Sequence, residues 1–156
     1  YYVKTLEEFK MRKSVETLKI ISLGMKKLSI QWYFGLNTAL TLNGVTHEFS
    51  PIIHVISDSI YRAKVIKING ENVKFIKLKK ELFGFGVVEK NELLYSNLEK
   101  TLLDMVYLAR YRSVAEERII SILREYREKV RKKRMKEYLK FYPKSVERVI
   151  ENAGLV

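Results

Sequence analysis

The segment from Ser96 to Leu108 is the feature that most constrains how this chain can fold. Its apolar residues follow a helical period and lie on almost every side of the predicted helix: Leu98, Leu102, Leu103, Met105, Val106, Tyr107 and Ala109. A helix that is apolar nearly all round belongs inside a domain, with neighbours on several sides. The segment is too short and too polar to span a membrane. We therefore predict a central core helix at about residues 97–109, with Leu102 in the core.

Three polar residues of this segment are predicted to have structural roles. Ser96 and Glu99 form a capping box, in which each side chain accepts a hydrogen bond from the backbone N–H of the other. Asp104 lies among apolar neighbours, where an unpaired charge would be costly to bury, and Lys100 stands one helical turn before it. We interpret Asp104 as an acid that locks the helix against a neighbour, rather than as a catalytic residue.

The composition fits one globular domain in a reducing compartment. A chain of 156 residues can bury roughly two-thirds of its unfolded surface, and the absence of cysteine excludes disulfides and thiolate chemistry. Without a signal peptide or an apolar run of membrane-spanning length, we expect a cytoplasmic protein that does not enter a membrane. Because the first residue is Tyr1 rather than Met, we expect a fragment or a processed product.

Residues 5–24 are predicted to be helical, and residues 29–95 to be mostly strand with one helix. In order, we expect helices at about residues 5–12 and 14–24, an aromatic strand at 29–34, and a short helix from Leu36 that ends at Gly44. The first two are separated because the apolar line changes phase between them. A capping box at Thr5–Glu8 opens the first helix, and Gly24 ends the second.

Residues 51–95 are predicted to be mostly strands. The continuous apolar run Ile52–Ile56 indicates a buried strand, and alternating residues on both sides of Asn69-Gly70 indicate a β-hairpin. We interpret Phe83 to Val88 as a further strand, whose glycines relieve crowding.

From about residue 113 onward the apolar spacing is helical throughout. Ile119, Leu123 and Val130 follow one line, and a phase shift near residue 132 predicts a break or a bend. Together these elements predict an α+β fold with a mixed or antiparallel sheet packed on the central helix. We expect one domain over residues 1–156, with an α/β core at 1–112 and a helical, basic C-terminal subdomain at 113–156.

The sequence offers few residues for catalysis or for a metal site. Its only aspartates are Asp58 and Asp104, and its only histidines are His47 and His54. Neither histidine has a second ligand residue at metal-binding spacing, so we interpret both as structural side chains. The glycines between Phe83 and Val88 lack the spacing and the following helix of a phosphate-binding loop. No catalytic residue, cofactor or metal is predicted.

The charge of the chain favours an anionic partner. The formal net charge is +12, and counterion release makes such proteins bind nucleic acid. Residues 110–148 carry 14 Lys and Arg against 6 Asp and Glu, and residues 61–81 carry 7 against 2. The positive charge therefore lies on two separate segments.

The C-terminal segment contains the main predicted binding residues. Arg124, Arg127, Arg131 and Arg134 recur at the spacing of one helical face, and that face is widened by Lys132, Lys133 and Lys136. Glu125 and Glu128 can neutralise only part of this charge. We expect contact with phosphate or with an acidic protein; the alternative is a solvated helix face.

The hairpin segment supplies a second predicted patch, made of Lys64, Lys67, Lys74, Lys77, Lys79 and Lys80. We expect Trp32 and Tyr33 in the core rather than on a base-stacking platform. The aromatic residues do not alternate with basic positions along the sequence, as they would on a sheet that binds single strands.

Three pieces of the sequence, in this order, resemble one family. They are the aromatic strand and small helix from Trp32 to Gly44, which includes Ala39-Leu40, the apolar strand Ile52–Ile56, and the helix with Leu98-Glu99-Lys100-Thr101-Leu102-Leu103-Asp104. The succession resembles the domain that follows the winged helix in AbiEi-like antitoxins of type IV abortive-infection systems, and in related transcriptional regulators of viral defence. The resemblance implies repression of an operon through promoter DNA and a nucleotidyltransferase toxin as partner. We expect the winged helix itself to be absent from this chain.

We therefore expect a non-enzymatic antitoxin or transcriptional-regulator domain that binds DNA, a toxin of the nucleotidyltransferase type, or both. Two alternatives stay open. One is a nucleic-acid-processing enzyme, either a nuclease or a nucleotidyltransferase-like domain, and the other is a general RNA-binding module.

Overall fold

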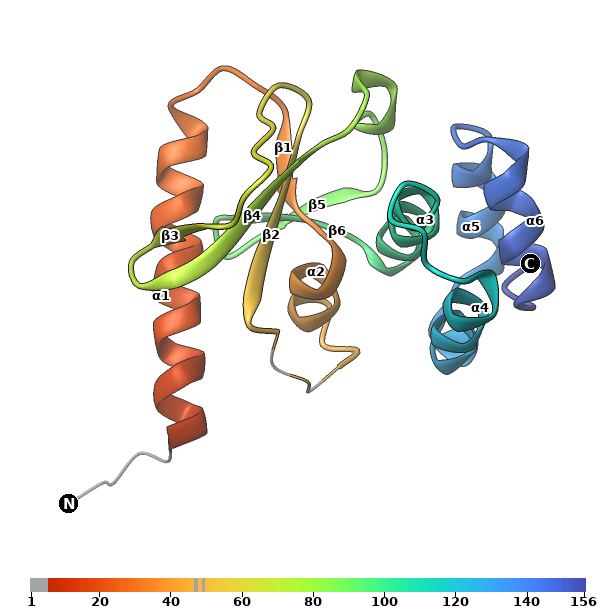
Figure 1. The fold of residues 1–156 in the computed structure, drawn as a ribbon, viewed down its shortest axis with the longest axis horizontal. Coiled ribbons are helices and arrows are strands. Elements are labelled where there is room, and N and C mark those ends of the chain that lie inside the picture. Colours follow the sequence, from red (N-terminus) through yellow and green to blue (C-terminus); the bar gives the residue numbers. More distant parts are fainter. Residues whose placement is uncertain (1–5, 47, 49) are drawn as a thin grey trace.

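The structure is a computed structural model that describes residues 6–46, 48 and 50–156 (Figure 1). Its helices are α1 (Leu6–Lys26), α2 (Leu36–Leu42), α3 (Leu98–Ala109), α4 (Glu116–Glu125), α5 (Lys132–Leu139) and α6 (Lys144–Asn152). Its strands are β1 (Trp32–Phe34), β2 (Ile52–Ser57), β3 (Ile66–Ile68), β4 (Glu71–Lys77), β5 (Val87–Lys90) and β6 (Leu93–Ser96). Short 3-10 turns lie at Lys80–Leu82 (η1) and Arg127–Lys129 (η2). The predicted α+β class is confirmed.

The sheet is mixed, with strand order β3-β4-β2-β1-β6-β5. The pairs β2–β4 and β1–β6 are parallel, and the other three pairs are antiparallel. The β3–β4 hairpin turns at Asn69 and Gly70, which both have positive φ angles, as a two-residue Asn-Gly turn requires. The predicted hairpin and the predicted strand after Pro51 are therefore confirmed.

Helices cover both faces of the sheet, because strand residues alternate between the faces (Figure 1). On one face, Trp32 and Phe34 pack with Leu18 and Ile21 of α1. On the other face, the strands contribute Tyr33, Ile56 and Ile76. These residues pack with Leu40 of α2 and with Leu102 and Leu103 of α3. Leu102 has no exposed surface, as predicted for a core residue.

The three C-terminal helices form a further layer on the side of α3 that faces away from the sheet (Figure 1). Leu123 of α4, Met135 of α5 and Ile150 of α6 are buried in the same cluster as Val106 of α3. The helix α3 is thus enclosed between the sheet and these helices, which explains why its sequence is apolar nearly all round.

The N-terminal prediction of two helices is wrong. One helix, α1, runs through residues 6–26 and continues past Gly24. Its phase change has a packing cause: Leu18, Ile21 and Met25 are buried against the sheet, whereas Val15 and Glu16 are exposed, and the first part of the helix extends beyond the strands (Figure 1). The predicted cap at Thr5 lies outside the described residues.

Two other local predictions need correction. Residues 83–86 are not a strand, since β5 begins at Val87. The helix α3 is capped by Asn97, whose side chain accepts a hydrogen bond from the Lys100 backbone N–H at 3.1 Å. Ser96 cannot serve as the cap because it is the last residue of β6, and its hydroxyl lies 2.7 Å from that of Thr101.

Among the described residues, none of the helices combines the length and the apolar character needed to cross a bilayer.

Candidate nucleic-acid interface

Asp104 lies at the centre of a buried polar cluster that joins the sheet, α3 and the turn between α5 and α6. Its carboxylate accepts a hydrogen bond from the Tyr33 hydroxyl and one from the Tyr142 hydroxyl, both at 2.6 Å. Lys100 Nζ lies 3.4 Å from the carboxylate and 3.2 Å from the Tyr142 hydroxyl. Asp104 and Lys100 have no exposed side-chain surface. A carboxylate with both oxygens occupied and no access to solvent is poorly suited to act on a substrate.

Aromatic rings complete the environment of Lys100. Its ammonium group lies 4.4 Å from the ring centre of Phe85 and 5.1 Å from that of Tyr33. The stem of Lys100 passes directly over Gly86, where a Cβ atom would lie 2.7 Å from Lys100 Cδ. Gly86 also has a φ of +68°. Glycine is therefore required here for two reasons, conformation and space, and the prediction that this glycine relieves crowding fits the structure although the predicted strand does not.

Burial dominates the titration of this cluster. It raises the pKa of Asp104, while the charge of Lys100 and the two tyrosine hydroxyls act in the opposite direction. Burial lowers the pKa of Lys100, and Asp104 opposes that change. Burial and the nearby Asp104 charge raise the pKa of Tyr33 and of Tyr142 well above their usual value. Both tyrosines therefore keep their protons and act as donors to Asp104.

Polar contacts also fix the C-terminal helices onto α3. The Asn97 side chain, besides capping α3, donates a hydrogen bond to the Tyr138 hydroxyl at 2.8 Å. Glu99, which was predicted to cap α3, instead forms an ion pair with Arg134 of α5 at 3.2 Å. The C-terminal segment is thus held to α3 by contacts of three residues, Asn97, Glu99 and Asp104.

The predicted arginine stripe on one continuous helix is wrong. Arg124 lies in the last turn of α4, Arg127 lies in η2, and Arg131 precedes α5 in an extended conformation. The helical path breaks between Glu125 and Lys132, in the region where the phase shift predicted a break, because Tyr126 and Val130 turn inward onto the core. We call the seven residues Arg124, Arg127, Arg131, Lys132, Lys133, Arg134 and Lys136 the basic segment.

Most of the basic segment carries uncompensated charge. Arg134 is paired with Glu99, and Arg127 lies 3.6 Å from Glu128. The other five members are exposed, and within the described residues they form no ion pair. The first turn of α5 contains no acid, although the helix dipole favours acids there. The dipole and three successive exposed cations, Arg131 to Lys133, therefore add to one positive field.

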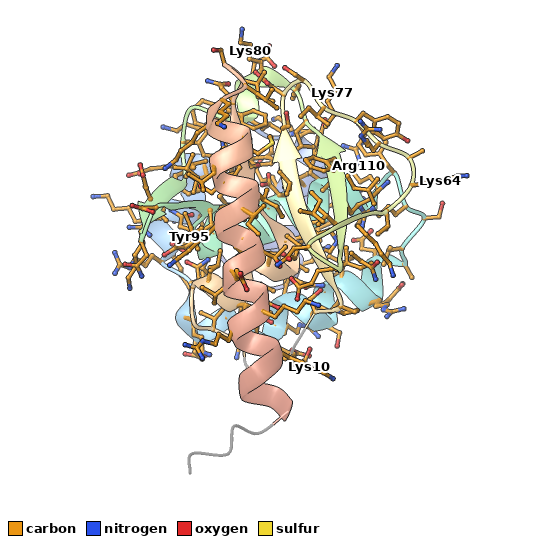
Figure 2. The ribbon with its side chains drawn as sticks, turned by 90° about the vertical axis from the view of Figure 1, so that its left-hand side faces the viewer. Lys10, Lys64, Lys77, Lys80, Tyr95 and Arg110 are labelled. Atoms are coloured by element: carbon orange, nitrogen blue, oxygen red, sulfur yellow. The ribbon has the colours of Figure 1, made fainter. Side chains whose placement is uncertain are left out.

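The predicted hairpin lysines lie elsewhere on the molecule. Lys64, Lys67, Lys77 and Lys79 are all exposed, and they belong to β3, β4 and the residues around them. Figure 2, drawn with α1 towards the viewer, shows Lys64 and Lys77 on the same side of α1. Figure 1 places this hairpin and α5 in different layers. The two predicted patches are thus separate surfaces.

A groove of about 440 Å³ joins three of the predicted hairpin lysines, Lys74, Lys77 and Lys79, to residues for which the sequence predicted no binding role. It is lined by Tyr61, Lys74, Phe75, Ile76, Lys77, Leu78, Lys79, Tyr107, Leu108, Tyr111 and Arg112. We call it the tyrosine groove. Lys79 Nζ lies 6.0 Å from the Tyr107 ring centre, and Lys74 Nζ lies 5.7 Å from that of Tyr61. Its walls come from β4 and from the end of α3, so no spacing within one segment indicated it.

His54 is buried on β2 beside Lys74, its neighbour in the β2–β4 register. Among the described residues its Nδ1 has no hydrogen-bond partner. Burial, and then the charges of Arg112 and Lys74, lower the pKa of His54 to about 4. His54 is therefore neutral near pH 7 and reports the positive field of the adjacent groove. His47 lies outside the described residues.

The described part of the chain holds no group of three His, Cys, Asp or Glu residues placed to bind a metal ion. Comparison of the chain with models of known protein families and with curated proteins finds no match.

Proposed function

We propose that this chain is a non-enzymatic regulator or antitoxin domain that binds duplex DNA through the basic segment. The observation that carries the proposal is the run of three exposed cations without an ion-pair partner among the described residues, Arg131 to Lys133, at the start of a helix whose first turn contains no acid. The positive end of the helix dipole repels these cations, and the cations repel one another, so their placement does not stabilise the fold. The negative charge of a bound phosphate backbone would compensate both repulsions.

The contacts expected of this surface are with phosphates rather than with base edges. Lysine and arginine side chains that neutralise phosphates release counterions, which gives affinity without sequence preference. Low sequence specificity is therefore part of the proposal. The anchors at Asn97 and Glu99 support it, because they hold α5 in a fixed orientation.

The resemblance to AbiEi-like antitoxins supports a further part of the proposal, namely a protein partner of the nucleotidyltransferase-toxin type in the cytoplasm. An acidic surface on such a partner would meet the same requirements as DNA phosphates. Competition between the partner and DNA for the chain is the expected consequence.

The test is the salt dependence of duplex binding, measured by fluorescence anisotropy. Replacement of Arg131, Lys132 and Lys133 by alanine should reduce the slope of log K against log salt by about 2–3, since each phosphate contact contributes about 0.9. The matched control replaces Lys10, Lys19 and Lys27, which are exposed cations on or just after α1. It removes the same net charge and should leave most of the slope intact.

Two results would contradict the proposal. An equal loss of slope in both triple variants would mean that overall charge, not the basic segment, binds DNA. Cleavage of DNA or RNA that requires Mg²⁺ and disappears when one acid is changed would instead favour the enzyme alternative.

A further inference from the structure

The tyrosine groove combines two kinds of side chain that sequence order keeps apart. Tyr61 and Tyr111 are 67% and 71% exposed, although both are large and apolar over most of their surface. Tyr107 packs edge-on against Tyr111, with ring centres 5.7 Å apart. Three tyrosines therefore line one groove, and two of them present most of their surface to solvent.

Positive charge surrounds these rings. Lys79 and Arg112 are exposed, and Lys74 is held in place by hydrogen bonds to the backbone carbonyls of Arg62 and Ala63. None of the described residues that line the groove is acidic. Burial first, and then the charges of Arg112 and Lys74, lower the pKa of the neighbouring His54.

Exposed rings and cations together select among the anionic ligands. An acidic peptide would neutralise the cations but would leave the two ring faces in water. Bases of a duplex are already stacked on each other, so they cannot reach the rings. An unpaired strand offers both a phosphate backbone for the cations and free base faces for the tyrosines, and each stacked base contributes measurably to affinity.

We propose that the tyrosine groove is a binding site for single-stranded nucleic acid. Unpaired bases stack on Tyr61 and Tyr111, and the intervening phosphates contact Lys79 and Arg112. The site is distinct from the basic segment and does not depend on the function proposed above. Because the chemistry is shared by DNA and RNA, both are tested as oligonucleotides of about ten residues, oligothymidine and oligouridine, which do not form duplexes.

Stacking can be observed directly with Tyr111→Trp. Trp32, the single tryptophan of the chain, is buried against α1 on the other face of the sheet, so its emission provides a constant background. We expect saturable quenching of the new indole by the single strand. The matched control is Leu23→Trp on α1, a position that is 63% exposed and far from the groove. Its emission should stay unchanged; equal quenching in both variants, or none in either, would overturn the proposal.

Affinity provides the second test. The double variant Tyr61→Ala and Tyr111→Ala should bind the single strand at least about thirtyfold more weakly at fixed salt, because it removes two stacked bases, each worth about 1–3 kcal/mol. The double phenylalanine variant keeps both rings and should bind as the parent does. Duplex binding should be equal in all three proteins. An equal loss for duplex and single strand, no loss at all, or displacement of the strand by a polyglutamate peptide but not by unlabelled strand would each refute the site.

Discussion

Lysine and arginine residues occupy two opposite environments in this protein, the buried cluster around Asp104 and the exposed basic segment. In the cluster, Lys100 is paired with an acid, donates a hydrogen bond to the Tyr142 hydroxyl and lies beside three aromatic rings. In the basic segment, three exposed cations in succession, Arg131, Lys132 and Lys133, stand at a helix start and form no ion pair among the described residues. The interior requires every charge to be matched, whereas the surface can keep charge available for a partner. The comparison predicts opposite responses to the removal of charge.

The largest effect is expected at Asp104. Asp104→Asn keeps the size of the side chain but leaves Lys100 buried without a counter-charge, which should lower the free energy of unfolding by about 3–5 kcal/mol. Urea denaturation measures the loss. Glu128→Gln serves as control, since its exposed pair with Arg127 should contribute less than about 1 kcal/mol. If the two variants lose the same small amount, the cluster does not hold the C-terminal helices.

His54 tests whether a buried group without an opposite charge beside it makes stability depend on pH. It is buried near two positive charges, those of Arg112 and Lys74. Its pKa is about 4 in the folded protein and about 6.5 in an unfolded chain. Below pH 6.5 the unfolded state therefore binds more protons, and stability falls as the pH drops, by up to about 3 kcal/mol near pH 4.

The measurement is urea denaturation at several pH values between 7 and 4. Other groups titrate in the same range, so the comparison is made with His54→Gln, which lacks this proton. The parent should lose more stability than the variant on acidification. Parallel curves for the two proteins would show that His54 takes up its proton in the folded state without cost.

The smallest effect, and the one with the opposite sign, is expected in the basic segment. Lys132→Glu places an acid at the first position of α5, so it should raise the free energy of unfolding by about 0.3–1 kcal/mol while weakening DNA binding. The matched variant is Lys136→Glu in the last turn of the same helix. There the dipole opposes an acid, so stability should fall although binding is again weakened. A loss of stability at both positions would show that the helix dipole does not act on the basic segment.

The fold was largely predictable because its elements are set by local residue patterns. The Asn69-Gly70 turn, the glycine that closes α2 and the apolar run of β2 each depend on a few neighbouring residues, and each was confirmed. The single helix α1 was missed because its packing changes along its length: only its second part lies on the sheet. The cap of α3 was displaced by one residue because pairing with Val87 extends β6 through Ser96.

The candidate site was less predictable, because it depends on where segments meet. The spacing of Arg124, Arg127, Arg131 and Arg134 suggested one face, but a helical period has no meaning across the break before Lys132. The tyrosine groove was missed for a related reason: Tyr61 and Tyr111 come from segments fifty residues apart in sequence. A pair of tyrosines one turn apart, Tyr107 and Tyr111, followed by Arg112, was the available indication.

The double role of Asn97 has a consequence for modularity. One amide side chain both begins α3 and binds Tyr138, and Tyr142 supplies one of the two hydroxyls on Asp104. The boundary near residue 112 therefore divides the chain by sequence but not by folding cooperativity. A truncation there would expose the apolar side of α3 that packs on the C-terminal helices, and it would remove the Tyr142 hydrogen bond to the buried Asp104. We therefore do not expect the basic helices to fold as a separate unit. The orientation of these helices is therefore set by their contacts with α3.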